Sequence, residues 1–146
     1  MKALFIFLAI AVTLTAAAQQ ITESDLLGQW KVTRIESVQM TIDYEKGEVT
    51  FAPEMVKSVP PEMLEAGKKQ VLEETMIAEF SEGLMLTMLK QGERDEVSYT
   101  LSYEEGKTLM HQPHTVIELT LNGDLLYMKS TGADEEAMVS LKKIKE

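Results

Sequence analysis

Short runs in which apolar and polar residues alternate fill the second half of the chain, and they limit its fold more than any other feature. Turn residues such as glycine and asparagine separate these runs at regular spacing. Alternation over a few residues is typical of strands that bury one face of an antiparallel sheet. The sequence therefore predicts a meander of strands, with runs at 75–80, 84–90, 93–103, 107–111, 115–121, 124–129 and 136–144.

The turns between these runs predict a register. Asn-Gly at 122–123 is the strongest signal, because a type I′ turn needs positive φ at both central positions. Gln-Gly at 91–92 gives a second two-residue loop, and loops of three residues are expected at 81–83 and 104–106. The expected cross-strand pairs are Leu119 with Leu126, Leu86 with Val97, Phe80 with Leu84, and Tyr99 with His111.

With this register, one parity stays apolar across all four turns. Ser98, Thr100 and Ser102 fall on the opposite face, as expected for a sheet that is buried on one side. Further runs at 30–42 and 48–51 bring the total to eight or nine strands, and closure into a barrel removes exposed edges. The expected inward residues are Met76, Phe80, Leu84, Leu86, Met88, Val97, Tyr99, Leu101, Leu119, Leu126 and Met128.

The segment 53–73 differs from the rest in kind. Prolines punctuate it at 53, 60 and 61, and proline is favourable in the first turn of a helix. A stripe of Met63, Leu64, Gly67 and Val71 has helical spacing. We expect one or two short helices that lie against the sheet or cap the mouth of the barrel.

The amino terminus predicts a secretory signal. Lys2 precedes an apolar run over 3–14, and Ala16-Ala17-Ala18 offers small residues for cleavage after Ala18. The run is shorter than the roughly 20 residues that span a bilayer, and no later stretch suits a membrane helix. The expectation is a signal peptide over 1–18, a single domain over 19–146, and a location after export that is periplasmic or secreted.

Composition limits the function classes. The chain holds 14 basic and 24 acidic residues, a formal charge of −10. Such a balance disfavours nucleic acid and anionic membrane surfaces as partners, because phosphate binding depends on lysine and arginine. There is no cysteine, so disulfides and a lipid-modified cysteine are excluded, and stability depends on packing.

A family resemblance begins at Leu27-Gly28-Gln29-Trp30-Lys31-Val32. A short helical turn over 21–27, capped by Thr22 or Ser24, then Gly-x-Trp opening the first strand, resembles lipocalins. The segments Phe80-Ser81-Glu82-Gly83-Leu84 and Tyr99-Thr100-Leu101-Ser102 are similar to hairpins of lipocalin-like proteins exported by Gram-negative bacteria.

The resemblance implies a mainly β fold: a single antiparallel up-and-down, lipocalin-like β-barrel of about eight strands, with a short helical insert near residues 53–73. It also implies that Trp30 closes the base of the barrel under a basic side chain from a late strand. Lys142 or Lys143 would supply that side chain here. The expected structural base is Gly28, Trp30 and Lys142.

The inward residues allow two interpretations. They are either an ordinary core, or the wall of a site for a small hydrophobic molecule, in which flexible methionines accommodate the guest and a cluster of Tyr99, Tyr103 and His111 orients it. The candidate ligand-binding residues in the barrel interior are Met76, Phe80, Leu84, Met88, Tyr99, Tyr103, His111 and Met128.

Catalytic and metal-binding patterns are absent from the sequence. It contains no Gly-x-Ser-x-Gly, no His-Glu-x-x-His and no phosphate-binding glycine loop. His111 and His114 are too few ligands for a zinc site. We therefore expect no enzyme, cofactor or metal, and a binding protein for a small hydrophobic molecule. The alternative is an interaction or inhibitor module that acts through loops or the helical insert and has no ligand cavity.

Overall fold

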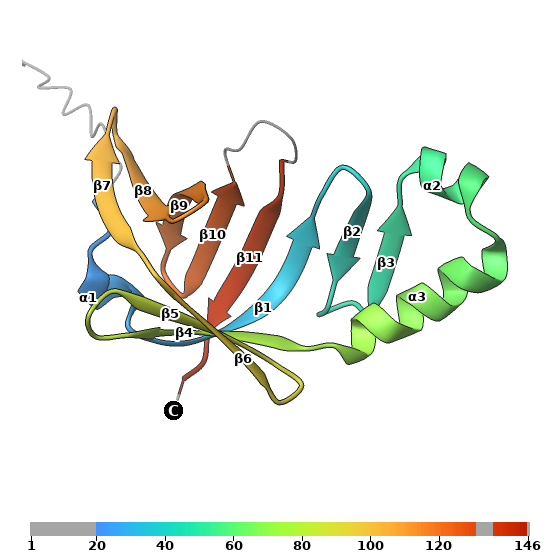
Figure 1. Cartoon of the computed structure of the whole chain (residues 1–146), viewed down its shortest axis with the longest axis horizontal. Coiled ribbons are helices and arrows are strands. Elements are labelled where there is room, and N and C mark those ends of the chain that lie inside the picture. The colour runs from blue at the N-terminus through green and yellow to red at the C-terminus, as the bar shows by residue number, and fades with distance from the viewer. Residues whose placement is uncertain (1–19, 131–135, 146) are drawn as a thin grey trace, which may run out of the picture.

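One curled antiparallel sheet carries most of the regular structure (Figure 1). The computed structural model describes residues 20–130 and 136–145. The predicted signal peptide over 1–18 lies outside this part of the chain. Within the described ranges, no helix combines the length and the apolar character needed to cross a bilayer.

The helices fall where the sequence predicts them. Helix α1 (Glu23–Leu26) is the short turn before the first strand, and Thr22 is its N-cap residue. Helices α2 (Pro53–Ser58) and α3 (Pro61–Glu73) make up the insert, and each has proline in its first turn. The prolines fix φ near the helical value and lack the N–H that a first helical turn leaves unpaired, which favours helix initiation there.

The strands follow the predicted runs, except that two runs are each divided into two strands. The run at 30–42 ends at Glu36 and resumes at Met40, and its two parts pair as a hairpin. The run at 93–103 is divided at Tyr99, because its two halves pair with different strands: residues 93–98 pair with 85–90, and residues 100–104 pair with 107–111. The backbone N–H of Tyr99 still donates to Leu84 O at 3.0 Å, in register with the first of these pairings. The strands are β1 (Gly28–Glu36), β2 (Met40–Asp43), β3 (Glu48–Phe51), β4 (Met76–Ser81), β5 (Met85–Lys90), β6 (Glu93–Ser98), β7 (Thr100–Glu104), β8 (Lys107–Gln112), β9 (Thr115–Asn122), β10 (Leu125–Ser130) and β11 (Met138–Lys143).

Strand β1 is the branch point of the sheet of eleven strands. Nine of them follow the order β6-β5-β4-β1-β11-β10-β9-β8-β7, and β2 and β3 lie off this path. Along one edge β1 pairs with β11; along the other it pairs first with β4 and then, from Arg34 onward, with β2. The sheet therefore forks at β1, and the β2–β3 hairpin adds strands to the roughly eight expected of such a barrel. The predicted fold class, mainly β with a curled antiparallel sheet and a helical insert, is confirmed.

The register at 91–92 matches the prediction. Leu86 pairs with Val97 across β5 and β6, and Lys90 pairs with Glu93. Gln91 and Gly92 both have positive φ, at 47° and 85°, as a type I′ turn requires.

Two other predicted registers are wrong by two residues. Leu119 pairs with Met128 rather than Leu126, and Phe80 pairs with Leu86 rather than Leu84. In each hairpin the tight turn lies further along the chain, and Leu84 itself takes a left-handed φ of 58° in the turn. A shift of two residues keeps every side chain on its predicted face.

The loop at 104–106 is shorter than predicted, and this difference moves the side chains of β8 to the opposite faces of the sheet. Glu104 pairs with Lys107, so only Glu105 and Gly106 form the loop, both with positive φ. A shift of one residue turns the whole of β8 over. Consequently the predicted pairing of Tyr99 with His111 is wrong, and His111 lies opposite Thr100 on the other face of the sheet.

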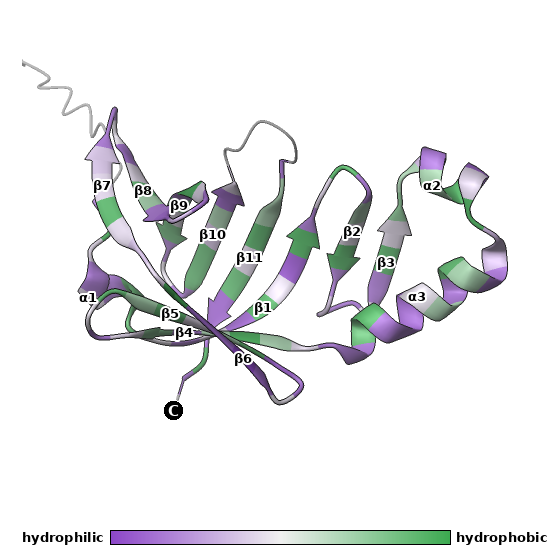
Figure 2. Cartoon of the chain, viewed as in Figure 1, coloured by the Kyte–Doolittle hydropathy of each residue, from purple (hydrophilic) through white to green (hydrophobic). Residues whose placement is uncertain are grey.

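The core lies on the inner, concave face. Trp30 is only 1% exposed, which confirms the prediction that it is buried, and Phe80, Met110 and Leu126 are buried beside it. Figure 2 shows apolar and polar residues alternating along many of the strands, which separates this inner face from the solvent-facing one.

Candidate ligand-binding site

Helix α1 seals one end of the curled sheet through a few specific contacts. Trp30 Nε1 donates to Leu26 O at 2.8 Å, and Ile21 N donates to Thr108 Oγ1 at 3.0 Å. Glu23 Oε1 accepts from the backbone N–H groups in the β4–β5 turn, at 2.9 and 3.1 Å. Leu26 is completely buried. This end of the concave face is therefore closed by a segment of four helical residues.

The start of α1 is itself fixed by a polar cap. Asp25 Oδ2 accepts hydrogen bonds from Thr22 N and Thr22 Oγ1, at 2.8 and 2.9 Å. These two hydrogen bonds hold the pKa of the Asp25 carboxyl below its usual value, since they stabilise the charged form.

At the base of the barrel a lysine packs over the ring of Trp30, but this lysine is Lys143 and not the predicted Lys142. Lys143 pairs with Trp30 in the register, and its Nζ lies 5.3 Å from the centre of the indole ring. Lys142 points to the other face, opposite Lys31. The assignment of Lys142 to the base is thus wrong: side chains alternate along β11, and only Lys143 shares the face of Trp30. Gly28 lies beside it with φ 119°.

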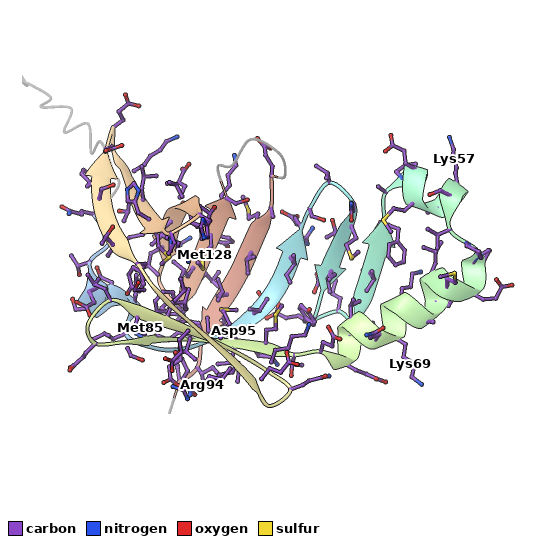
Figure 3. All side chains as sticks on the ribbon, in the orientation of Figure 1. Lys57, Lys69, Met85, Arg94, Asp95 and Met128 are labelled. Atoms are coloured by element: carbon purple, nitrogen blue, oxygen red, sulfur yellow. The ribbon has the colours of Figure 1, made fainter. Side chains whose placement is uncertain are left out.

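Away from α1, the concave face is only partly covered. Its apolar side chains pack against the core and remain half-buried. Figure 3 shows side chains crowding the space between β4–β6 and the strands behind them. The half-buried set includes Ile35, Met76, Met88, Val97, Ile117, Met128 and Val139.

The structure brings together most of the predicted ligand-binding residues. Cross-strand pairing places Met76, Phe80, Met88, Tyr99 and Met128 on the concave face or in the core cluster beneath it. Leu84 packs against the same core from the β4–β5 turn.

The predicted polar cluster does not form. Tyr103 shares the concave face but is 41% exposed at the edge strand β7. His111 lies on the opposite face, where its Nε2 and Ser102 Oγ are 2.6 Å apart. The one-residue change in the 104–106 loop is the reason, because it moved His111 away from Tyr99.

Tyr99 stands apart from the other polar groups of the core. It is 3% exposed, and its ring packs edge-to-face on Phe80 with the centroids 5.9 Å apart. Its hydroxyl oxygen is buried and has no hydrogen-bond partner among the described residues. Burial raises the pKa of the Tyr99 hydroxyl, and the negative charge of Glu23 raises it further, so the group remains a neutral donor.

The helical insert borders the opposite end of the concave face. Ile35 pairs with Ile42, and Ile42 with Val49, so the apolar face continues from β1 onto the β2–β3 hairpin. Helix α3 packs on β3 at this point, with Lys68 Nζ 5.9 Å from the centre of the Phe51 ring. No residue of α2 or α3 is fully buried.

A second contact joins the end of α3 to β5. Lys90 Nζ lies 2.9 Å from Glu74 Oε2, and Gln91 Nε2 donates to Glu73 O at 3.3 Å. The ion pair raises the pKa of Lys90 and lowers that of Glu74. Both side chains are accessible to water, so the pair adds little stability.

Sequence reasoning did not anticipate a pocket of about 560 Å³ beside α1, where Ile21 meets β8 and β9. Its walls include Asp25 and Glu105 as well as Lys107 and Glu118, whose charged atoms are 3.7 Å apart. These charged walls suit an apolar guest less well than the concave face does. The pocket arises from the docking of α1 on distant strands, which no local sequence pattern signals.

Comparison with known proteins gives no family. No family model matches the chain, and no curated protein matches it. Among solved structures, it is similar to lipid binding protein 8 of Caenorhabditis elegans, with 12% identity over 86% of this chain and 100% of that one and a TM-score of 0.49. It is also similar to a Schistosoma mansoni fatty acid binding protein in complex with arachidonic acid, with 18% identity, the same coverages and a TM-score of 0.46. A third is Echinococcus granulosus fatty-acid-binding protein 1, with 13% identity over 82% and 97% and a TM-score of 0.45.

Proposed function

We propose that this protein binds one small apolar molecule on the concave face of its sheet, between the end sealed by α1 and the helical insert. The observation that carries the proposal is the half-buried apolar set, which includes Met76, Met88 and Met128. A ligand seated there removes apolar surface from water, which contributes about 25 cal/mol per Å². From its amino-terminal sequence, we propose that the protein acts after export.

The methionines make this face adaptable. Methionine is unbranched, so its side chain moves aside at low cost and packs against guests of different shape. The buried residues around Trp30 give the site a firm floor, because they are close-packed and tied to α1. This arrangement favours a compact or flexible hydrophobic ligand over a flat, extended partner surface.

A matched pair of methionines on β5 tests the proposal. Met88 lies opposite Ala78 on the concave face, and Met85 lies opposite Ser81 on the other face; both are half-buried. We expect a solvatochromic apolar dye to bind with a stoichiometry of about one to one, because the proposed site is a single face of one sheet. Met88→Glu should weaken binding about tenfold or more, because a buried ligand would desolvate the new charge.

The control, Met85→Glu, should leave dye affinity unchanged, because its side chain faces away from the site. Titration of dye fluorescence measures both variants. The proposal fails if the native protein binds no dye, or if the two substitutions have equal effects.

A second candidate function rests on the insert. Val56 on α2 and Met63 on α3 are 55% and 64% exposed, so the insert presents two large apolar side chains to solvent. This observation favours an interaction module that uses the insert to contact another protein. If the native protein binds no dye, this interaction function becomes the leading candidate.

A further inference from the structure

The hydroxyl of Tyr99 is a polar group that a ligand on the concave face could bind. Among the described residues, the Tyr99 hydroxyl is the buried side-chain polar atom that lacks a hydrogen-bond partner. Such a group loses its hydrogen bonds to water on burial, and this loss is offset only when a ligand supplies a partner. Tyrosine donates through its O–H, so the fitting partner is an oxygen that accepts a hydrogen bond.

The lysines at concave register positions are already engaged. Lys90 lies 2.9 Å from Glu74 Oε2. Lys143 lies over the ring of Trp30, with its Nζ 5.3 Å from the centre of the ring. Neither ammonium is therefore free of a nearby carboxylate or ring.

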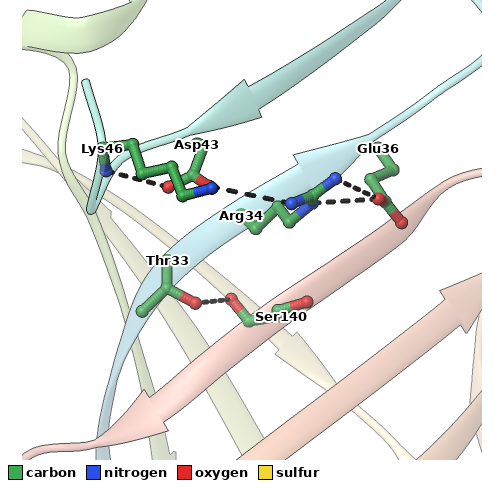
Figure 4. A network of polar contacts seen from close by, with 6 residues as sticks. All are labelled: Thr33, Arg34, Glu36, Asp43, Lys46 and Ser140. Carbon is green, nitrogen blue, oxygen red and sulfur yellow. Dashed lines mark hydrogen bonds and ion pairs between the residues drawn. The ribbon is translucent and has the colours of Figure 1, made fainter. Parts of the chain in front are cut away.

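The arginines of the chain lie on the convex face. Arg34 contacts Glu36 at 2.8 Å and Asp43 at 3.7 Å, as Figure 4 shows. Arg94 contacts Glu96 at 2.9 Å and points away from the enclosed side in Figure 3. Arginine is the side chain best suited to hold a carboxylate, because its planar fork donates two parallel hydrogen bonds. In the described part of the chain, the concave face has no arginine to do so.

Carboxylates instead border the concave face. Asp95 lies opposite Met88, and Glu93 opposite Lys90, both on the edge strand β6. Glu23 is close enough to Tyr99 to raise the pKa of its hydroxyl. These acids would repel an anionic head group and leave a neutral one unaffected.

We propose, on the basis of the function proposed above, that this site selects an uncharged lipid-like molecule over the corresponding carboxylate. The Tyr99 hydroxyl donates a hydrogen bond to a carbonyl, ester or alcohol oxygen of the ligand. The half-buried methionines cover its hydrocarbon part. The native packing leaves the oxygen without solvent contact, so the side chains that cover it must move before a ligand reaches it.

The experiment compares methyl dodecanoate with dodecanoate as competitors of the bound dye at pH 7. We expect the ester to displace the dye at a concentration at least about tenfold lower than the ion. Tyr99→Phe removes only the oxygen, and it should weaken binding of the ester about tenfold after correction for the dye affinity measured in the same variant. The unfolding midpoint of Tyr99→Phe should stay the same or rise, because the variant no longer buries an unpaired hydroxyl.

A second variant tests the charge argument independently. Asp95→Lys replaces an exposed acid at the rim by a cation. It should strengthen the binding of dodecanoate several-fold and leave the binding of the ester no stronger. The inference is overturned if native protein binds the ion as tightly as the ester, or if Tyr99→Phe leaves ester binding intact. If neither competitor nor dye binds, the proposed function itself fails.

Discussion

Helix α1 and the α2–α3 insert lie at opposite ends of the same curved sheet (Figure 1) and are held in opposite ways. Helix α1 has four residues, yet it buries Leu26 completely and makes hydrogen bonds to Trp30 and the β4–β5 turn. The insert contains a helix of 13 residues, and no residue of either of its helices is fully buried.

The difference teaches that anchoring depends on buried contacts and not on helix length. A buried apolar side chain and a paired buried donor each contribute to stability, while exposed ion pairs such as Lys90 with Glu74 contribute little. We therefore expect the α1 end to open only when the whole domain unfolds. The insert should open at lower cost, as suits the border of a binding site.

The largest expected effect is at Trp30. Trp30→Ala removes the floor of the closed end and leaves the Leu26 carbonyl without its donor. We expect a loss of about 3–5 kcal/mol in the free energy of unfolding, as for other large-to-small core changes. Chemical denaturation monitored by circular dichroism measures it. A loss below about 1 kcal/mol would show that α1 does not anchor this end.

An intermediate effect distinguishes the two helices directly. Leu26→Ala on α1 should cost about 2–5 kcal/mol, because the side chain is wholly buried. Leu64→Ala on α3 makes the same chemical change at a half-buried position and should cost less than about 1 kcal/mol. Equal losses in urea unfolding would contradict the comparison.

Two glycines should give changes of opposite sign, both smaller than the losses expected at Trp30 and Leu26. Gly67 lies inside α3, and an added Cβ would meet nothing within 4 Å, so Gly67→Ala should raise stability by about 0.5–1 kcal/mol. Gly28 follows α1 with φ 119°, a conformation that alanine adopts only with strain, so Gly28→Ala should cost about 1–3 kcal/mol. Thermal melts measure both variants. A lower melting temperature for Gly67→Ala, or a higher one for Gly28→Ala, would contradict this prediction.

The turns show how far local sequence fixes the register. At 91–92 the Gln-Gly pair gave the right loop length, because both residues take the positive φ of a type I′ turn. At 104–106 the same glycine signal is compatible with loops of two or three residues. The structure has the shorter one, which places His111 on the convex face. This difference of one residue in loop length is the reason that Tyr99 and His111 do not form the predicted polar cluster.

Sequence alone determined the elements of this protein: alternating strands, glycine turns and a proline-initiated helical insert. These follow from side-chain periodicity and backbone preference, which act over a few residues. Tertiary structure decided the fork of the sheet at β1, the choice of Lys143 over Lys142 at the base, and the free hydroxyl in the core. Each depends on which distant segments meet across the sheet, and pairing over long separations is set by packing of the whole chain rather than by local pattern.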